Sequence, residues 1–375
     1  PGLTLPASAL RLEARISATP AALDFESFSA TFGASDLSGR ARISLAPRPV
    51  VDIELHADSL DLTPFIPREQ QAASPQRKLL IPDFPLPLER LDKLDGRFAL
   101  HADKLLFAGL EYSAVGFDAR LEHGNLAAAP IGFANRNGTF SGQLDIRSAG
   151  TVPLVRLAGS GKSLLLDFGG SNPFGLLRYD GEIDLAGEGR SLRELATSLR
   201  GTLRFTSAGA RLPNSKLNLM YSSFFGQLLQ TLNPLMKREP YTDVICAAYA
   251  LRAEGGVLRT DPALVIRTSA LDIMSHGAAD LRNESIDLKF RTVAREGLGL
   301  SATQLLNPYV KVSGTLAKPE LTLDQKGTLI SGGTAVATGG LSILASSVWD
   351  RFSTLEDPCA SVIAEADRRA ATAPH

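Results

Sequence analysis

The chain has 375 residues, of which 44% are hydrophobic, 21% charged and 6% aromatic, and its 39 Lys and Arg residues nearly balance 40 Asp and Glu residues. The apolar fraction is too high for a disordered protein, and a net charge of −1 provides no field that would attract a nucleic acid. Its two cysteines are too few for a disulfide-rich mini-domain. We therefore expect a folded protein with one or two hydrophobic cores and no nucleic-acid partner.

Alternation of apolar and polar residues is the main pattern along the chain. In residues 51–57, Val, Ile and Leu alternate with Asp, Glu and His, a period of two that is typical of half-buried strands in an antiparallel sheet. Glycine-containing dipeptides predict turns at 38–39, 95–96, 141–142, 180–181, 255–256 and 313–314. The same alternation recurs at Phe98/Leu100, Leu144/Ile146, Ile183/Leu185, Leu203/Phe205, Ile286/Leu288/Phe290 and Val310/Val312. About 20 strands would fit, and an open sheet of that size must curl or fold over on itself.

Helical patterns are few. Residues 191–199 predict a short helix in which Ser191 is the N-cap and Glu194 completes a capping box. A second amphipathic helix is predicted near 214–233, where Leu, Met, Tyr and Phe recur at steps of three and four before Asn233-Pro234. Core packing is the favoured role of its apolar stripe, and a lid or lipid-contacting role is the alternative.

Proline positions suggest where the chain divides. Six prolines between positions 64 and 87 accompany charged and amide residues, as in a solvated connector. We predict the end of an N-terminal β-repeat unit at 1–66, a Pro-rich connector at 67–90, a β-rich unit at 91–325 and a Gly/Ser-rich tail at 326–375. The uncharged stretch 327–349 contains too much Gly, Ser and Thr for a membrane span.

Signals of catalysis or metal binding are missing from the sequence. The five histidines are scattered without metal-ligand spacing, and there is neither a C-x-x-C nor a G-x-S-x-G motif. Residues 159–163 (Gly-Ser-Gly-Lys-Ser) resemble part of a phosphate-binding loop, but Arg156 stands where its first glycine would be required. We predict a protein that is not an enzyme and uses no metal or cofactor.

The two cysteines, Cys246 and Cys359, allow two interpretations. In a reducing compartment each would be a small buried hydrophobic residue. In an oxidising compartment they would form one disulfide that ties the C-terminal tail back to the sheet, and this second interpretation is the favoured one.

Several segments, taken in order, resemble the C-terminal portion of the AsmA-like family of bacterial envelope proteins. They include 59–65 (Ser-Leu-Asp-Leu-Thr-Pro-Phe), 81–88 (Ile-Pro-Asp-Phe-Pro-Leu-Pro-Leu), 198–205 (Ser-Leu-Arg-Gly-Thr-Leu-Arg-Phe), 232–235 (Leu-Asn-Pro-Leu), 312–319 (Val-Ser-Gly-Thr-Leu-Ala-Lys-Pro) and 357–360 (Asp-Pro-Cys-Ala). The resemblance extends over nearly the whole chain, although each segment alone has low specificity.

The resemblance implies a fold and a place in the cell. It implies a long twisted antiparallel β-sheet curled into an apolar-lined groove, with residues 91–325 as the AsmA-like C-terminal β-groove and one or two short amphipathic helices. It also implies a periplasmic location, with an anchor in the bacterial inner membrane that would lie upstream of Pro1. The two cysteines of the family fall where Cys246 and Cys359 fall, which strengthens the expectation of a disulfide.

The function implied is non-enzymatic transport of phospholipid between the inner and outer membranes, across the periplasm, with acyl chains on the apolar face of the groove. Apolar residues of the alternating segments are then the candidate lipid contacts, while the polar residues between them face water. An envelope assembly factor that supports outer-membrane protein biogenesis, with envelope or outer-membrane proteins as partners, is the alternative. The candidate lipid contacts are Ile53, Leu55, Phe98, Leu100, Leu144, Ile146, Leu203, Phe205, Ile286, Leu288 and Phe290.

Overall fold

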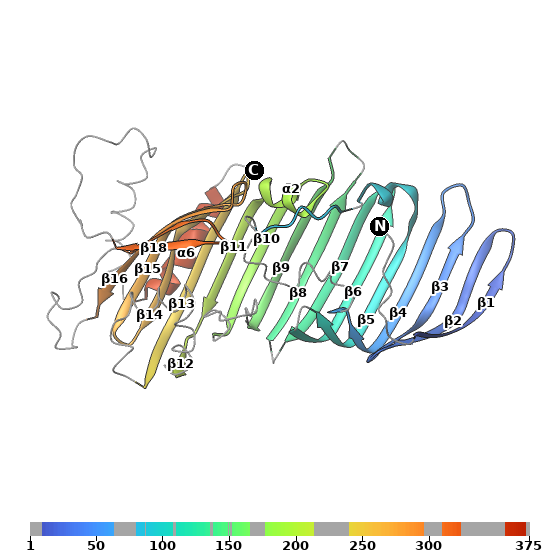
Figure 1. The fold of residues 1–375 in the computed structure, drawn as a ribbon, viewed down its shortest axis with the longest axis horizontal. Coiled ribbons are helices and arrows are strands. Elements are labelled where there is room, and N and C mark those ends of the chain that lie inside the picture. Colours follow the sequence, from blue (N-terminus) through green and yellow to red (C-terminus); the bar gives the residue numbers. More distant parts are fainter. Residues whose placement is uncertain are drawn as a thin grey trace. The chain divides into compact units, whose positions relative to one another are not determined.

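The computed structural model describes residues 10–63, 80–86, 88–107, 110–135, 138–148, 150, 152–165, 177–213, 240–295, 310–323 and 357–372. These residues form one large, open, mixed β-sheet of 18 strands with two short helices and a 3-10 helix (Figure 1). The protein is therefore mainly β, as its alternating sequence predicts. The chain separates into two compact units: unit 1 comprises Pro1–Leu164 and Ile183–Ser198, and unit 2 comprises Leu165–Glu182 and Leu199–His375.

Unit 1 contains the first nine strands, part of β10, helix α2 (Leu192–Thr197) and the 3-10 helix η2 (Leu88–Lys93). The strands are β1 (Leu10–Ala18), β2 (Ala22–Phe32), β3 (Ser35–Ser44), β4 (Val50–Asp61), β5 (Asp95–Phe107), β6 (Leu110–Glu122), β7 (Asn125–Asn135), β8 (Gly138–Arg147), β9 (Leu154–Leu164) and β10 (Tyr179–Glu188). From β1 to β9, each strand pairs with the next along the chain.

The expectation of an antiparallel sheet is wrong at one place. Strands β4 and β5 are parallel, with Ile53 opposite Phe98 and Leu55 opposite Leu100. A parallel pair requires the chain to return to the end of the sheet where it started, which a tight hairpin cannot do. The long segment between Asp61 and Asp95 makes that return possible. The alternation of side chains cannot reveal strand direction, because its period is two in both cases.

Several of the glycines that were expected at turns lie inside strands instead. Gly39 is in β3 and Gly142 is in β8, opposite Gly159 of β9. A methyl group at Gly39 would come within 2.0 Å of the Glu54 carbonyl oxygen, so glycine here permits close strand contact. Of the predicted turn positions, 255–256 does form the turn between β13 and β14. The predicted alternating segments all lie in strands, namely β4, β5, β8, β10, β11, β16 and β17.

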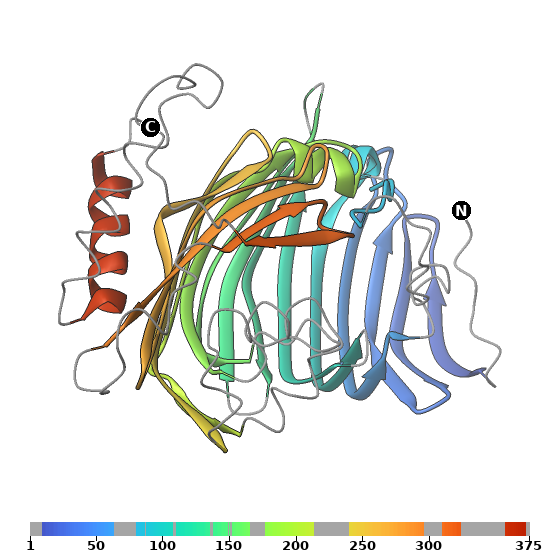
Figure 2. The same cartoon turned by 60° about the vertical axis from the view of Figure 1, so that its left-hand side comes forward.

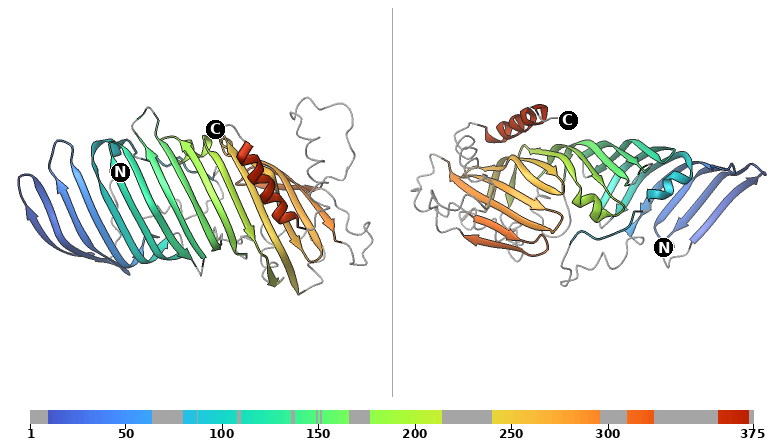
Figure 3. Two further views of the ribbon diagram at one scale, coloured as in Figure 1. Left: turned by 180° about the vertical axis from the view of Figure 1, so that it is seen from behind. Right: turned by 90° about the horizontal axis from the view of Figure 1, so that it is seen from above.

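Unit 2 combines the remaining strands with helix α6 (Pro358–Thr372), which packs on β13 and β14 (Figures 2 and 3). Its strands are β11 (Arg200–Ser207), β12 (Ala210–Pro213), β13 (Tyr241–Glu254), β14 (Val257–Thr268), β15 (Leu271–Asp280), β16 (Ser285–Ala294), β17 (Val310–Gly314) and β18 (Pro319–Leu323). Under α6, alanines and Val265 of the sheet meet Val362 and Ala366 of the helix in a buried cluster. A disulfide joins Cys246 of β13 to Cys359 of α6, which confirms the predicted pair.

The two α-helices of the structure can be compared with the helices predicted from the sequence. Helix α2 confirms the prediction at 191–199, because the Ser191 hydroxyl accepts a hydrogen bond from the Glu194 N–H at 3.2 Å. The Glu194 carboxylate accepts from the Arg190 N–H at 2.6 Å, one residue earlier than in a standard capping box. Helix α6 is not among the predicted elements, although Asp357-Pro358 is a typical helix start and the Asp357 carboxylate accepts from the Ala360 N–H at 3.0 Å. The predicted helix near 214–233 and residues 326–356 of the tail lie outside the described residues.

Candidate functional site: the two faces of the sheet

The register of unit 1 brings six of the predicted lipid contacts onto one face of the sheet. Ile53 lies opposite Phe98, and Leu55 opposite Leu100. Each opposed pair belongs to a row of residues that crosses the strands. The row of Ile53 and Phe98 continues through β6 and β7 to Leu144 in β8, and Ile146 lies in a neighbouring row. Opposed residues share a face of a sheet, so residues distant in the sequence form one apolar surface. The rows across β4 to β9 are Ile53–Phe98–Ala119–Ala128–Leu144–Leu157, Leu55–Leu100–Phe117–Ile131–Gly142–Gly159 and Val51–Gly96–Leu121–Leu126–Ile146–Val155.

This apolar face is only partly withdrawn from solvent. Ile53, Phe98, Leu100 and Leu144 are partly buried. Within the described part of unit 1, extensive contacts join neighbouring strands, and the one further pair is β7 with η2. A sheet normally buries its apolar face against another layer. Three members of these rows, Ala119, Leu121 and Ala128, are buried, but in the described residues no second sheet makes extensive contacts with this face.

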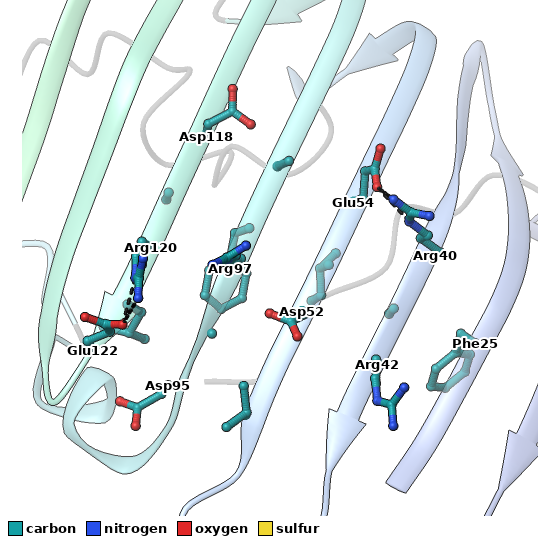
Figure 4. Close-up of a pocket in the computed structure, with 18 of the residues that line it drawn as sticks. Phe25, Arg40, Arg42, Asp52, Glu54, Asp95, Arg97, Asp118, Arg120 and Glu122 are labelled. Carbon is teal, nitrogen blue, oxygen red and sulfur yellow. Dashed lines mark hydrogen bonds and ion pairs between the residues drawn. The ribbon is translucent and has the colours of Figure 1, made fainter.

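The opposite face of unit 1 carries charges in register. One row runs from Asp24 through Arg42, Asp52 and Arg97 to Arg120, across β2 to β6. The row continues through Ala127 and Asp145 to Arg156 in β9. Figure 4 shows the labelled Arg, Asp and Glu side chains gathered over these strands. From Asp24 to Arg97 the charges alternate in sign, which stabilises the sheet and disfavours a shifted register. Arg97 and Arg120 are a like-charged pair at the end of this run.

Ion pairs within unit 1 link the neighbouring strands of this charged face. The Arg40 Nε donates to the Glu54 carboxylate at 2.7 Å, and Arg156 donates to both carboxylate oxygens of Asp184 at 2.9 and 2.8 Å. These side chains are exposed to solvent, so each pair contributes little to stability. A concavity of about 1150 Å³ lies over β1 to β7 and is lined by many of the same charged residues. Its lining mixes both signs of charge, with seven carboxylates and four arginines.

Asp95, at the start of β5, has the most clearly perturbed carboxylate of this concavity. The Arg48 guanidinium donates to both its oxygens, at 2.6 and 2.8 Å, and the His123 N–H donates to it at 2.7 Å. The hydrogen bonds from Arg48, followed by the one from His123, lower the pKa of Asp95 to about 2. This arrangement holds the loop before β4, the start of β5 and the β6–β7 turn together. Its role is structural, since the carboxylate is fully engaged.

Two histidines occupy neighbouring positions on the charged face. His56 in β4 is opposite His101 in β5, with ring centroids 5.6 Å apart. Glu54 lies 3.5 Å from the Nε2 of His56, and Asp118 lies 4.0 Å from the Nε2 of His101. Their spacing along the chain does not predict this pair, because only the parallel β4–β5 register brings the two histidines together.

The five predicted lipid contacts in unit 2 lie in a more enclosed setting. Phe205 packs against the buried cluster of Tyr179, Tyr249 and Leu212. Ile286, Leu288 and Phe290 of β16 pack against a second cluster formed by Ile273, Val310 and Val312. Leu203 is partly buried in β11, opposite Leu251. Phe205, Ile286, Leu288 and Phe290 therefore lie at the edges of hydrophobic clusters.

A buried tyrosine pair was missed by the sequence analysis. The hydroxyls of Tyr179 in β10 and Tyr249 in β13 are 3.3 Å apart, and the side chains are 1% and 8% exposed. Burial raises the pKa of Tyr179 to about 12 and that of Tyr249 well above its usual value. Both hydroxyls are therefore neutral at physiological pH. The two positions are 70 residues apart, so no local pattern could have paired them.

A metal centre was not predicted, and the described residues contain one candidate group. Its members are Cys246, Asp357 and Cys359. The two sulfur atoms are bonded to each other in the disulfide, and a zinc site would require them as thiolates. In the oxidised protein this group therefore offers a single exposed carboxylate.

Comparison with known proteins gives no assignment. No family model, no curated protein and no solved structure matches the chain. Of the helices that the structure describes, none has the length and apolar character needed to cross a membrane.

Proposed function

We propose that this protein is a non-enzymatic carrier of phospholipid, which binds acyl chains on the apolar face of its sheet and moves them between the inner and outer membranes. The observation that carries the proposal is the apolar face of unit 1: in-register aliphatic and aromatic residues from β4 to β9, among which Ile53, Phe98 and Leu144 stay partly exposed. An alkyl chain needs such a surface and no fixed polar pocket. Lipid headgroups would remain in water at the rim.

The setting proposed is the periplasm, with an inner-membrane anchor in the full-length protein. The Cys246–Cys359 disulfide supports an oxidising compartment, where such bonds persist. The order of the AsmA-like segments in the sequence supports the envelope as the location. Transport of this kind uses no nucleophile, metal or nucleotide, and we propose no catalytic residue.

A direct experiment is to purify the 375-residue protein from bacteria, extract it with organic solvent and identify bound lipid by mass spectrometry. The proposal predicts phospholipid in near-stoichiometric amount. It also predicts that a fluorescent phospholipid is displaced by other diacyl lipids but not by the water-soluble headgroup, because the acyl chains make the contacts. Protein that is free of lipid and does not bind the fluorescent phospholipid would contradict it.

A second candidate is an envelope assembly factor that acts through its surface. The exposed apolar residues of β1, Leu10, Leu12 and Ile16, favour it, since exposed apolar patches mark protein-binding surfaces. Cross-linking in cells would then recover an outer-membrane or envelope protein on β1, and lipid binding would be absent.

A further inference from the structure

The histidines His56 and His101 form an exposed pair on the charged face of unit 1. They are opposite each other in the parallel register of β4 and β5, and their ring centroids are 5.6 Å apart with an interplanar angle of 61°. The His56 side chain is 56% exposed and the His101 side chain 46%. Both imidazoles are therefore accessible to a ligand from solvent.

The separation of the two rings suits a shared metal ion. Imidazole nitrogen is a preferred ligand of Zn²⁺, Ni²⁺ and Cu²⁺. Two imidazoles that bind one tetrahedral ion at ~2.0–2.1 Å have their ring centroids about 5 Å apart, which is close to the 5.6 Å between His56 and His101. The two strands thus hold the pair at nearly the separation that a shared ion requires.

Each histidine of the pair has a carboxylate beside it. Glu54 lies 3.5 Å from the Nε2 of His56, and Asp118 lies 4.0 Å from the Nε2 of His101. The two carboxylates come from β4 and β6, on either side of β5 (Figure 4). A histidine that binds a metal ion usually turns its second ring nitrogen toward a carboxylate, which orients the ring and makes the first nitrogen a stronger ligand. Glu54 and Asp118 are placed for this role.

The charges around the pair favour a cation. The Arg40 Nε donates to the Glu54 carboxylate at 2.7 Å, and Arg40, followed by His56, lowers the pKa of Glu54, so this group stays ionised. The carboxylates of Glu54 and Asp118 carry two negative charges, against the single positive charge of Arg40. A divalent cation at the histidines would therefore be attracted by its surroundings.

Small residues next to the pair leave room for an ion and its water ligands. Ala99 in β5 is opposite Glu54 on one side and Asp118 on the other, and Gly116 in β6 is opposite His101. A methyl group at Gly116 would meet no atom within 4 Å. Space is therefore open beside the imidazole of His101.

We propose that His56 and His101 form a binding site for a divalent transition-metal ion, with Zn²⁺, Ni²⁺ and Cu²⁺ preferred to Mg²⁺ and Ca²⁺, and with water at the remaining positions of the ion. The site has two protein ligands, and unlike the group at Cys246 it requires no thiolate. A bound ion would join β4 to β5, two strands that a long connection separates in the sequence. The inference concerns the charged face and does not depend on the proposed transport function, which uses the apolar face.

Calorimetric titration of the full chain with ZnCl₂ tests the site. We expect one equivalent of Zn²⁺ to bind with a micromolar dissociation constant, and Mg²⁺ not to bind comparably. His56→Asn and His101→Asn should each raise the dissociation constant for Zn²⁺ at least about tenfold, because one of two ligands is lost. The double variant should bind little more weakly than either single variant, because the two ligands act as a unit.

The matched control is His123→Asn. His123 is an exposed histidine at the β6–β7 turn, and asparagine tolerates its positive φ of 50°. This control removes an imidazole from the same unit but not from the pair, so we expect it to bind Zn²⁺ like the wild type. Circular dichroism verifies that each variant is folded.

Two further measurements examine the ligands and the folded state. Electron paramagnetic resonance with one equivalent of Cu²⁺ should show two imidazole nitrogens on the ion in the wild type and one in His56→Asn or His101→Asn. Zn²⁺ should raise the urea midpoint of the wild type but not that of the double variant, because the sheet brings the two ligands together only in the folded chain. A wild type that does not bind Zn²⁺, or a double variant that binds it as tightly as the wild type, would overturn the proposal.

Discussion

Cys246 of β13 and Cys359 of α6 are covalently joined, although 113 positions separate them in the sequence. The bond lies within a buried cluster, where Val362 and Ala366 of the helix pack on Val265 of the sheet. Arg369 adds an ion pair to Asp261 at 2.8 Å. The helix is thus held by a covalent bond, by apolar packing and by charge.

Removal of the disulfide should weaken this part of unit 2. The double variant Cys246→Ala/Cys359→Ala is expected to lower the free energy of unfolding by about 2–4 kcal/mol, because a long loop is no longer closed in the unfolded chain. Urea unfolding monitored by circular dichroism measures the effect. The wild type with reductant is the control and should behave like the variant. An unchanged midpoint in both would show that α6 is held by packing alone.

Substitution of the strand glycine Gly159 should lower the stability of the protein. A methyl group there would lie 2.6 Å from the Cζ of Phe140 and 2.8 Å from the Ser141 carbonyl oxygen. Since the nearest backbone cannot move freely within the sheet, Gly159→Ala is expected to cost about 1–3 kcal/mol. Ser160→Ala, at an exposed position one residue away, is the control. Thermal unfolding compares them, and equal midpoints would contradict the packing described.

Stability should depend on pH through His276. Burial, and then the charge of Lys289, lower the pKa of this imidazole to about 4, while Asp287 acts weakly in the opposite direction. The unfolded chain takes up the proton near pH 6.5, but the folded chain does not until about pH 4. The contribution of neutral His276 is therefore complete above pH 6.5 and is lost as the pH falls toward 4.

The check compares His276→Gln with the wild type. Both should lose stability in acid because other groups also titrate, but the variant should lose less between pH 6.5 and 4. Urea midpoints at several pH values give the comparison. Parallel curves for the two proteins would exclude a role for His276.

The pKa of Asp95 depends on Arg48. Removal of the guanidinium in Arg48→Ala should raise the pKa of Asp95 from about 2 toward its ordinary value of 3.8, while the hydrogen bond from the His123 N–H retains part of the shift. In the wild type, the stabilising effect of this lowered pKa is present above pH 4 and is lost as the pH falls toward 2. Carboxyl-carbon NMR titration measures the pKa. An unchanged value in Arg48→Ala would show that Arg48 is not its main cause.

The fold class could be predicted from the sequence because period-two alternation directly reflects a sheet with one apolar face. The same alternation places residues such as Ile53 and Phe98 on faces, but it does not say which strands are neighbours. The parallel pairing of β4 with β5, and with it the contact of His56 with His101, depends on a long connection. These tertiary relationships leave no local pattern.

Glycine caused most of the wrong predictions of turn positions. Gly39 and Gly142 have the sequence context of turns, yet they lie inside strands where a side chain would meet a neighbouring backbone. A turn and a close strand contact both require the smallest residue, so the sequence alone cannot separate them. Helix α6 was missed although Asp357-Pro358 starts it, because the Gly- and Ser-rich residues before it suggested an irregular tail.

The most direct test of the proposed function compares two glutamates on adjacent residues of β8. Leu144→Glu places a charge on the apolar face, and Gln143→Glu places the same charge on the exposed opposite face. The measurement is phospholipid bound per protein, by mass spectrometry of purified samples with the same content of β-structure. We predict that Leu144→Glu loses most of its lipid while Gln143→Glu retains the wild-type amount. Equal lipid in the two variants would contradict binding on the apolar face.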